Sequence, residues 1–295
     1  MLFLLYINDI NLNINNRSIK LFADDTVIYN SNKDTNVCKE QVQDDLNRIS
    51  KWCEVNNMAL NKKKTKIMIF GKKSITNKLQ NIEIHVGNFK LEQVSHFRYL
   101  GMTLDENLNF IQHINNIKKN VRHKIYLLRR FSKYMTDAVR LLIYKSHILP
   151  IIEYGDIIYM KSHKKHLDKL QRLQNLSLKI CLNVHKRTST NVIHKVSNLN
   201  LLHERRTHHL LNFLYSRTKI NKYLDNDKQG PTLRSNTCNT LKVPTYRNNT
   251  AKNSIKYHGS IIWNNQDYEI KQIDTKLKYH RHLKYLYKDI RSNYQ

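Results

Sequence analysis

Cysteine, glycine and proline are scarce in this 295-residue chain, which has four, six and three of them. The cysteines lie far apart and form no CxxC pair: Cys38, Cys53, Cys181 and Cys238. This spacing argues against a zinc ribbon or a disulfide framework and predicts reduced intracellular thiols. With 40% hydrophobic residues, the chain should fold rather than behave as a linker or a low-complexity segment.

Long apolar runs are also missing. The opening run, residues 1–7, is too short for a secretory signal, has no basic region before it, and is followed by Asn8-Asp9. No stretch approaches the ~18 apolar residues of a membrane span. We therefore expect an intracellular protein of the nucleus or cytoplasm. Because Met1 stands directly on a run that looks buried, the chain is expected to begin inside a truncated domain.

Acidic residues are few, 23 Asp and Glu against 51 Lys and Arg, which leaves a net charge of +28. A polyanion would relieve this repulsion, so nucleic acid is the first expected partner and an anionic membrane surface the second. The predicted basic helices lack a Leu-rich and aromatic insertion face, which disfavours the membrane. The histidine pairs 163/166 and 208/209 have no Cys or acidic partner at ligand spacing, so no metal site is expected there.

The first hundred residues combine short strands with a helix. Apolar runs at 19–23 and 26–29 predict a hairpin with Asp24-Asp25 at its tip. A helix is predicted to start at Asp34 or Thr35 and to end at Asn56-Asn57. Its apolar stripe has spacings of four, three and four: Val42, Leu46, Ile49 and Cys53. Further strands are predicted at 65–70, 82–86 and 94–100.

From about residue 110 the apolar spacing becomes helical. One stripe comprises Phe110, Ile114, Ile117, Val121, Ile125 and Leu128. Basic residues lie among these, mostly on other faces: Lys118, Lys119, Arg122, Lys124, Arg129 and Arg130. Further helices are predicted over 136–149, 167–176 and 199–217, packed as a bundle. After residue 225 we expect a loose tail with one docked segment at 261–263.

Two pairs of adjacent aspartates stand in different contexts. Asp44-Asp45 falls within the predicted helix and is interpreted as a solvated helix surface. Asp24-Asp25 would be fixed at the tip of a hairpin, where two carboxylates suit Mg²⁺. Such ions activate the attacking oxygen and stabilise the leaving oxygen in phosphoryl transfer. An ordinary acidic turn is the commoner explanation of the pattern, because turns favour Asp.

Phe22-Ala23-Asp24-Asp25 resembles the metal-binding motif of reverse transcriptases. Four further segments resemble motifs of non-LTR, jockey-type elements in the same order: 2–10, 60–70, 97–110 and 149–155. The resemblance implies an α+β fold, with a truncated polymerase palm of antiparallel sheet and helices over residues 1–108. It further implies a mostly α-helical thumb over 109–224 and a partly ordered C-terminal tail over 225–295.

The resemblance also implies roles for individual residues. Asp24 would bind the catalytic metals, and Asp25 would be a neighbouring ligand or support. Lys64 would lie near the departing pyrophosphate, unless it is only one of a run of solvated lysines. The backbone that holds the primer end would comprise Tyr99, Leu100 and Gly101, although a glycine there is equally explained by a turn.

The implied activity is that of an RNA-directed DNA polymerase with an RNA template, a DNA primer, dNTPs and Mg²⁺, with Mn²⁺ as the alternative ion. The basic helix over 117–130 would follow the sugar–phosphate backbone of the template–primer duplex. Polymerisation also needs an earlier palm Asp and the fingers, which have no room here, so the chain is expected to be inactive alone. The alternative is a non-catalytic nucleic-acid-binding protein that uses only the basic thumb.

Overall fold

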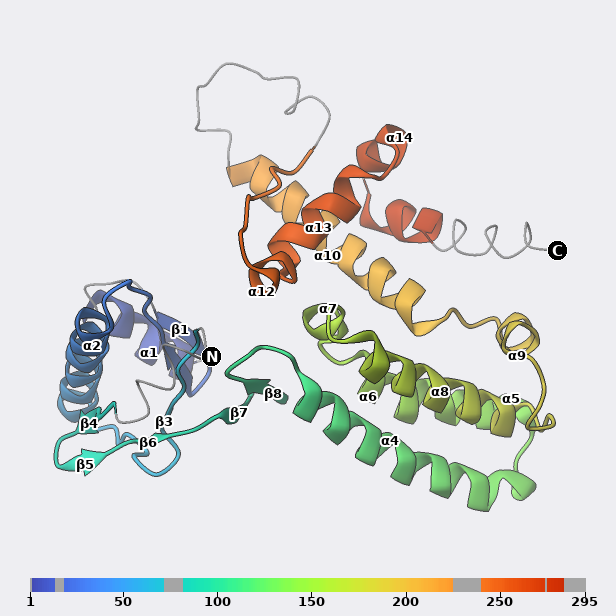
Figure 1. Ribbon diagram of the computed structural model, residues 1–295, viewed down its shortest axis with the longest axis horizontal. Helices are drawn as coiled ribbons and strands as arrows, with labels where there is room; N and C mark the ends of the chain where they lie inside the picture. Colours follow the sequence, from blue (N-terminus) through green and yellow to red (C-terminus); the bar gives the residue numbers. More distant parts are fainter. Residues whose placement is uncertain (1, 14–18, 72–81, 225–239, 274, 284–295) are drawn as a thin grey trace. The chain divides into compact units, whose positions relative to one another are not determined.

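The computed structural model describes residues 2–13, 19–71, 82–224, 240–273 and 275–283 (Figure 1). The chain divides into two compact units. The first comprises residues 1–99 and 105–107, and the second comprises residues 100–104 and 108–295. Helices predominate and the strands are short, so the chain is of the α+β class that the sequence predicts.

Helix α2 organises the first unit. The unit begins with α1 (Leu2–Ile7), the 3-10 helix η1 (Asn8–Asn13), the hairpin strands β1 (Ile19–Phe22) and β2 (Asp25–Ile28), and α2 (Thr35–Val55). The Asp34 side chain accepts a hydrogen bond from the Asn36 amide at 2.8 Å, and Asn56 caps the other end. Both ends of α2 are therefore where the sequence predicts them, because capping residues define them.

The strands of the first unit are shorter than predicted. They form two-stranded sheets: β3 (Lys66–Ile67) with β6 (Glu92–Gln93), and β4 (His85–Val86) with β5 (Phe89–Lys90). A further hairpin, β7 (His96–Tyr99) and β8 (Met102–Asp105), stands where the chain passes from the first unit to the second. The β3–β6 pair is parallel, and its ladder ends where the Val94 amide donates to the Ile67 carbonyl at 2.9 Å. The expected strands 65–70 and 94–100 are therefore wrong in extent, because pairing covers only part of each apolar run.

Asp45 corrects the interpretation of the second aspartate pair. Asp44 is exposed and pairs with Arg48 at 3.0 Å, as a solvated helix surface would. Asp45, by contrast, is fully buried. It lies next to Leu46 in the sequence, on the side of α2 that packs into the core of the unit. Its burial went unpredicted because a carboxylate is normally expected on the solvated side of an amphipathic helix.

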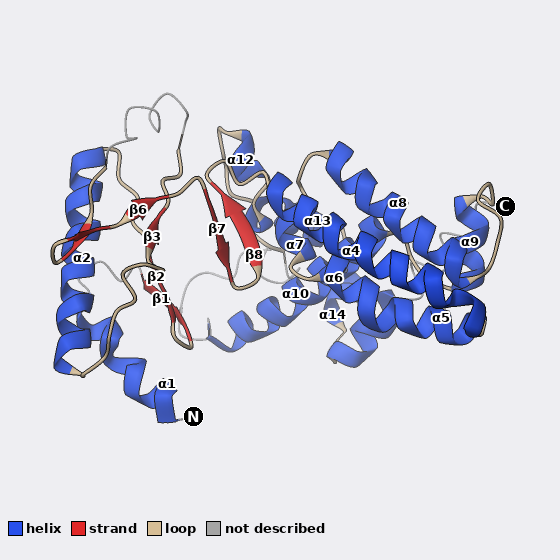
Figure 2. Cartoon of the chain, turned by 90° about the horizontal axis from the view of Figure 1, so that it is seen from below, coloured by secondary structure: helices blue, strands red, loops and turns tan. Residues whose placement is uncertain are grey.

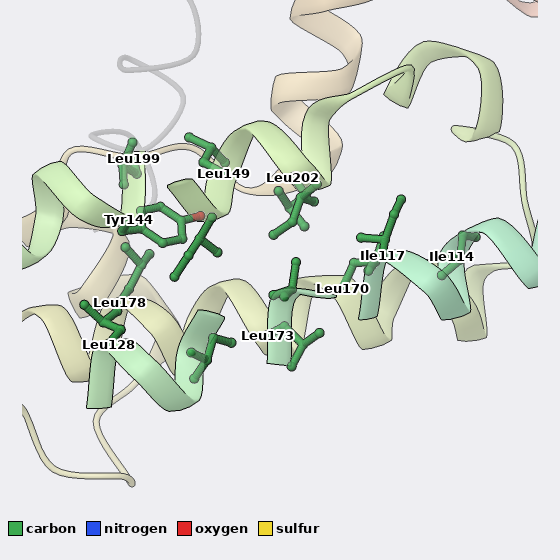
Figure 3. Packing of buried hydrophobic residues seen from close by; sticks show 14 of the residues in the cluster. Ile114, Ile117, Leu128, Tyr144, Leu149, Leu170, Leu173, Leu178, Leu199 and Leu202 are labelled. Carbon is green, nitrogen blue, oxygen red and sulfur yellow. The ribbon is translucent and has the colours of Figure 1, made fainter. Parts of the chain in front are cut away.

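The second unit is a bundle of helices (Figure 2). Up to residue 224 its helices are α4 (Ile111–Phe131), η3 (Ser132–Tyr134), α5 (Asp137–Ile143), the π-helix η4 (Tyr144–Ile148), α6 (Leu149–Glu153), α7 (Asp156–Tyr159), α8 (Lys164–Cys181), α9 (Thr190–Ser197) and α10 (Leu202–Leu224). All six residues of the predicted apolar stripe are buried in its core, among them Ile114, Ile117 and Leu128 (Figure 3). The periodicity alone therefore predicted α4 and its buried face correctly.

The helical path predicted over 136–149 does not end before Pro150 but continues past it. Pro150 stands in the first turn of α6, directly after the π-helical turn η4. Proline lacks an N–H and its ring crowds the carbonyl four residues earlier. The wider π turn accommodates both effects, so the chain stays helical as far as Glu153.

Arg140 joins the ends of two helices. Its guanidinium donates to the carbonyls of Cys181 and Ser132, both at 2.8 Å, and to that of Met135 at 2.6 Å, and it pairs with Asp137. Ser132 follows α4 and Cys181 is the last residue of α8. The C-terminal ends of these helices therefore lie together, and the two helices run parallel.

A smaller core forms around Trp263. Helices α12 (Asn249–Lys252), α13 (Ile255–Asn264) and α14 (Tyr268–Gln272) belong to this region, and α13 packs against α10. The ring of Tyr279 stacks on that of Tyr215 with centroids 4.2 Å apart. The docked segment expected at 261–263 is confirmed, and docking extends to Leu283. The parts of the expected tail at 225–239 and 284–295 lie outside the described residues.

Three cysteines, Cys38, Cys53 and Cys181, are free thiols, as predicted. Burial raises the pKa of the Cys181 thiol to about 12, so it stays protonated and unreactive. Cys238 lies outside the described residues. Among the described helices, none combines the length and the apolar character that crossing a bilayer requires.

Candidate functional site

The β1–β2 hairpin presents Asp24 and Asp25 to solvent. Phe22 pairs with Asp25, so Ala23 and Asp24 form a two-residue turn. Ala23 has a left-handed backbone with φ of 52°, which costs a residue with a Cβ about 1–2 kcal/mol. The surrounding pairing holds the turn in this conformation. The backbone of Asp24 and Asp25 is consequently fixed at the hairpin tip, and both residues are exposed.

The core determines which way the hairpin faces. Ile19 and Leu21 belong to the first unit's core, in the cluster that contains Trp52. Side chains alternate along a strand, and directly opposed residues share a face. Asp25 therefore lies with Phe22 on the opposite face, and Phe22 is 62% exposed. The face with Ile19 and Leu21 anchors the hairpin in the core, and the face with Phe22 leaves the Asp25 carboxylate accessible to a ligand.

The donor set at the hairpin tip fits a hard divalent cation. No group of three or more His, Cys, Asp or Glu side chains suited to a metal occurs among the residues that the structure describes. Mg²⁺ does not require one, since it commonly binds one or two carboxylates together with water and substrate phosphates. Asp24 and Asp25 could supply those carboxylates.

Lys64 lies on a turn that Asn61 organises. The Asn61 side-chain oxygen accepts from the Lys64 amide at 3.0 Å. The Asn61 carbonyl accepts from the Thr65 amide at 3.0 Å and from the Thr65 hydroxyl at 2.9 Å. The turn leaves the Lys64 side chain exposed. No described hydrogen bond or ion pair joins it to Asp24 or Asp25.

The loop between β7 and β8 is a tight turn at Leu100-Gly101. Both residues have positive φ, 44° and 79°, as a two-residue hairpin turn of the I′ type requires. The Tyr154 hydroxyl donates to the Leu100 carbonyl at 2.6 Å. A Cβ on Gly101 would lie only 3.1 Å from the Tyr154 ring. The glycine is thus needed both for the turn and for the close approach of Tyr154.

Gly155, which follows Tyr154, also packs against the β7–β8 hairpin. It also has a left-handed backbone, with φ of 64°, and a Cβ there would overlap Met102. We call the packing of Tyr154-Gly155 against residues 100–102 the hairpin clasp. The sequence indicated both segments, 97–110 and 149–155, but not their contact. The tyrosine–glycine pair inside the segment 149–155 is the local feature that could have indicated a close approach.

Ion pairs attach the residues beside the clasp to α10. Glu153 pairs with Arg205 in a two-pronged contact, in which Arg205 Nη2 lies 3.1 Å from Glu153 Oε2. Asp156 Oδ2 lies 2.8 Å from Nδ1 of His209, and this hydrogen bond raises the pKa of His209. These pairs hold the segment after α6 against a long helix, which keeps Tyr154 in position.

The predicted basic residues of α4 do not all share one face. Lys118, Arg122 and Arg129 are spaced by four and seven residues and therefore lie along one side of the helix. Lys119 and Arg130 lie next to them on the exposed surface. Lys124 falls on the other side of the buried stripe. The structure thus brings together five of the six residues on one side of α4.

Protonation of His208 is expected to destabilise the second unit. The side-chain nitrogen of Asn212, Nδ2, lies 3.2 Å from Nδ1 of His208 and 3.2 Å from Nδ1 of His280. Each ring therefore accepts a hydrogen bond at Nδ1. Burial, followed by the charge of His280, lowers the pKa of His208 to about 4. Because the pKa of His208 is lower in the folded state than the unfolded value of 6.5, the folded state favours neutral His208. This contribution to the free energy of unfolding is fully present above pH 6.5. It is lost as the pH falls from 6.5 toward 4.

Urea unfolding at about pH 7 and about pH 4.5 measures this effect. The loss attributable to His208 is expected to be about 2 kcal/mol, allowing for its partial contact with solvent. His208→Gln should flatten the pH dependence by that amount, whereas His147→Gln, at an exposed position, should not change it. An unchanged pH profile in His208→Gln contradicts the assignment.

Comparison with known proteins identifies part of the chain. Residues 1–104 match the family described as "Reverse transcriptase (RNA-dependent DNA polymerase)". The chain is 28% identical over 165 residues to the "RNA-directed DNA polymerase from mobile element jockey" of Drosophila melanogaster, covering 55% of this chain and 18% of that protein. It is 26% identical over 192 residues to the "Probable RNA-directed DNA polymerase from transposon BS" of the same fly, covering 64% and 21%.

A third similar protein comes from a wasp. Over 180 residues the chain is 24% identical to the "Retrovirus-related Pol polyprotein from type-1 retrotransposable element R1 2" of Nasonia vitripennis, covering 59% of this chain and 44% of that protein. The chain thus spans less than half the length of these relatives. The family match covers the Asp24-Asp25 hairpin and the Leu100-Gly101 turn. Residues 1–104 thus match the reverse transcriptase family, and over more than half of its length the chain is similar to RNA-directed DNA polymerases of mobile elements.

Proposed function

We propose that this chain supplies part of the palm and the thumb of an RNA-directed DNA polymerase that copies an RNA template from a DNA primer with dNTPs. One observation carries the proposal. Phe22-Ala23-Asp24-Asp25 stands at a solvent-facing hairpin tip within the 104 residues that match the reverse transcriptase family. In this assignment the palm comprises residues 1–108, the thumb 109–224 and the tail 225–295.

Asp24 and Asp25 would hold Mg²⁺ together with the phosphates of the incoming nucleotide. A divalent ion bound there would supply positive charge at the attacking 3′-hydroxyl and at the leaving pyrophosphate. The protein's own part is to fix the two carboxylates through the strained turn at Ala23. Lys64, held on the turn that Asn61 organises, would add a positive charge, or a proton, near the pyrophosphate.

The other two elements would bind the template–primer duplex. The Tyr99-Leu100-Gly101 backbone would hold the primer end, with the hairpin clasp keeping residues 100–102 in place. The exposed basic side of α4 would contact the sugar–phosphate backbone without regard to sequence. Contacts of this kind release counterions, so binding should weaken steeply as salt is raised.

Hybrid binding and primer extension by the purified chain test this proposal together. We expect the chain to bind an RNA–DNA hybrid in a salt-dependent way, because the basic side of α4 is exposed. We also expect no template-dependent dNTP incorporation in Mg²⁺. This family's polymerase uses a further, earlier Asp, and the one aspartate before Asp24 is Asp9, which lies in the segment 2–10 that resembles a different motif.

Two outcomes would change the proposal. Absence of hybrid binding at low salt contradicts it outright. Primer extension that Asp24→Ala abolishes and Asp44→Ala leaves intact contradicts only the expected inactivity, and it would support a metal-binding role for Asp24. Asp44 is a suitable control because it is an exposed aspartate paired with Arg48 on a helix.

A further inference from the structure

Helix α8 carries a row of basic side chains next to the basic side of α4. The two helices pack side by side (Figure 2) and run parallel, since Arg140 bonds carbonyls at both C-terminal ends. Lys165, Lys169 and Arg172 are spaced by four and three residues and therefore lie along one side of α8. That side is distinct from the buried one, which includes Leu170 and Leu178.

Side chains of the two helices converge near their N-terminal ends. The pKa of Lys118 on α4 is lowered by burial and then by the positive charges of Lys169 and Arg122. The pKa of His166 on α8 is lowered by burial and then by nearby Lys169, His163, Lys118 and Lys165. Lys118 and Lys169 are therefore close enough to repel each other across the helix–helix boundary.

Acidic residues compensate little of this charge. Asp168 is the one acidic residue of α8, and α4 contains none. Within the part of the chain that the structure describes, no ion pair involves Lys118, Lys165 or Lys169. Concentrated positive charge of this kind raises the free energy of the unliganded protein, and a bound polyanion would remove the penalty.

We propose that Lys165, Lys169 and Arg172 of α8 form, with Lys118 and Arg122 of α4, a single phosphate-binding strip for the sugar–phosphate backbone of the template–primer duplex. We call it the α4–α8 strip. The inference rests on the proposed function, in which α4 is the one helix assigned to nucleic-acid binding, and it adds a second helix. Two parallel helices pack about 8–10 Å apart, so the strip offers two rows of cations where a lone helix offers one.

The salt dependence of hybrid binding distinguishes direct phosphate contacts by α8 from the general effect of the chain's positive charge. The probe is a fluorescent RNA–DNA hybrid of about 24 base pairs, titrated at about 50 to 300 mM NaCl. The test variant is Lys165→Gln/Lys169→Gln/Arg172→Gln. The control, Lys186→Gln/Arg187→Gln/Lys195→Gln, removes the same charge from exposed positions of the same unit. Circular dichroism checks that both variants stay folded.

The test variant is expected to bind at least tenfold more weakly at about 100 mM salt. The slope of log K against log salt should become shallower by about 2 to 3, since each phosphate contact contributes about 0.9. The control should change the slope by less than about 1. Equal slopes for the two variants overturn the α4–α8 strip, as would binding to anionic lipid vesicles in preference to the hybrid.

A third variant, Lys119→Gln/Arg122→Gln on α4, distinguishes this inference from the proposed function. If it weakens hybrid binding while the α8 variant behaves like the control, the proposed function stands and the strip is wrong. If the unaltered chain does not bind the hybrid at all, both are wrong. Weakening by both the α4 and α8 variants, with the control unaffected, supports the two-helix surface.

Discussion

Replacing Arg140 by methionine is expected to lower the free energy of unfolding of the second unit by about 3 kcal/mol. Arg140 is 6% exposed and donates to three backbone carbonyls at the ends of α4, η3 and α8. Methionine fills a similar volume but leaves these carbonyls without their donor. The lost hydrogen bonds, together with the desolvation of the carbonyls, account for the expected loss.

Urea unfolding followed by the fluorescence of Trp263 measures the effect. The chain has two tryptophans, and Trp52 lies in the first unit, so a Trp52→Phe background leaves one reporter in the second unit. Arg130→Met is the control, because Arg130 is exposed on α4. If the two substitutions have equal effects on the unfolding midpoint, Arg140 does not join the helix ends as described.

Gly155→Ala is expected to destabilise the same unit by about 2–4 kcal/mol. Part of this cost arises because alanine is disfavoured at a φ of 64°. The rest arises because the new methyl group would overlap Met102 Sδ and lie 3.0 Å from Met102 Cε, which is overpacking at a buried side chain. The same urea assay reports the loss.

Two comparisons make the Gly155 prediction specific. Gly259 lies within α13, where a Cβ would make ordinary contacts of 3.4 Å or more. Gly259→Ala should therefore be neutral or stabilising, since alanine favours helices. In a Met102→Ala background the cost of Gly155→Ala should shrink, because the overlap is gone. An undiminished cost in that background would mean that backbone strain alone explains the effect.

Local patterns predicted the elements whose signals lie close together in the sequence. The α2 helix was predicted with its ends because Asp34 and Asn56 cap it and its apolar residues recur at helical spacing. The α4 helix was predicted because six apolar residues follow one stripe. The Asp24-Asp25 hairpin was predicted because short apolar runs flank the pair, and the pairing of Phe22 with Asp25 confirms it.

Features that depend on distant partners were not predictable in the same way. An apolar run such as 65–70 predicts a strand, yet pairing with Glu92-Gln93 decides how much of it becomes β3. Asp45 looked solvated because helix periodicity gives no account of a buried carboxylate. The Arg140 guanidinium donates to the Cys181 carbonyl, 41 positions away in the sequence, and no local pattern indicates that contact. The roles of Asp24, Asp25 and Lys64 in catalysis stay predictions.

The hairpin clasp also bears on the order in which the second unit folds. The bond between the Tyr154 hydroxyl and the Leu100 carbonyl joins residues 54 positions apart, and α4, α5, η4 and α6 all lie between them. Closing so long a loop costs entropy that the intervening helices must first offset by packing together. We therefore expect the clasp to form late in folding, so that weakening it should speed unfolding more than it slows folding. By this reasoning, the turn proposed to hold the primer end acquires its fixed shape only after the helices behind it have assembled.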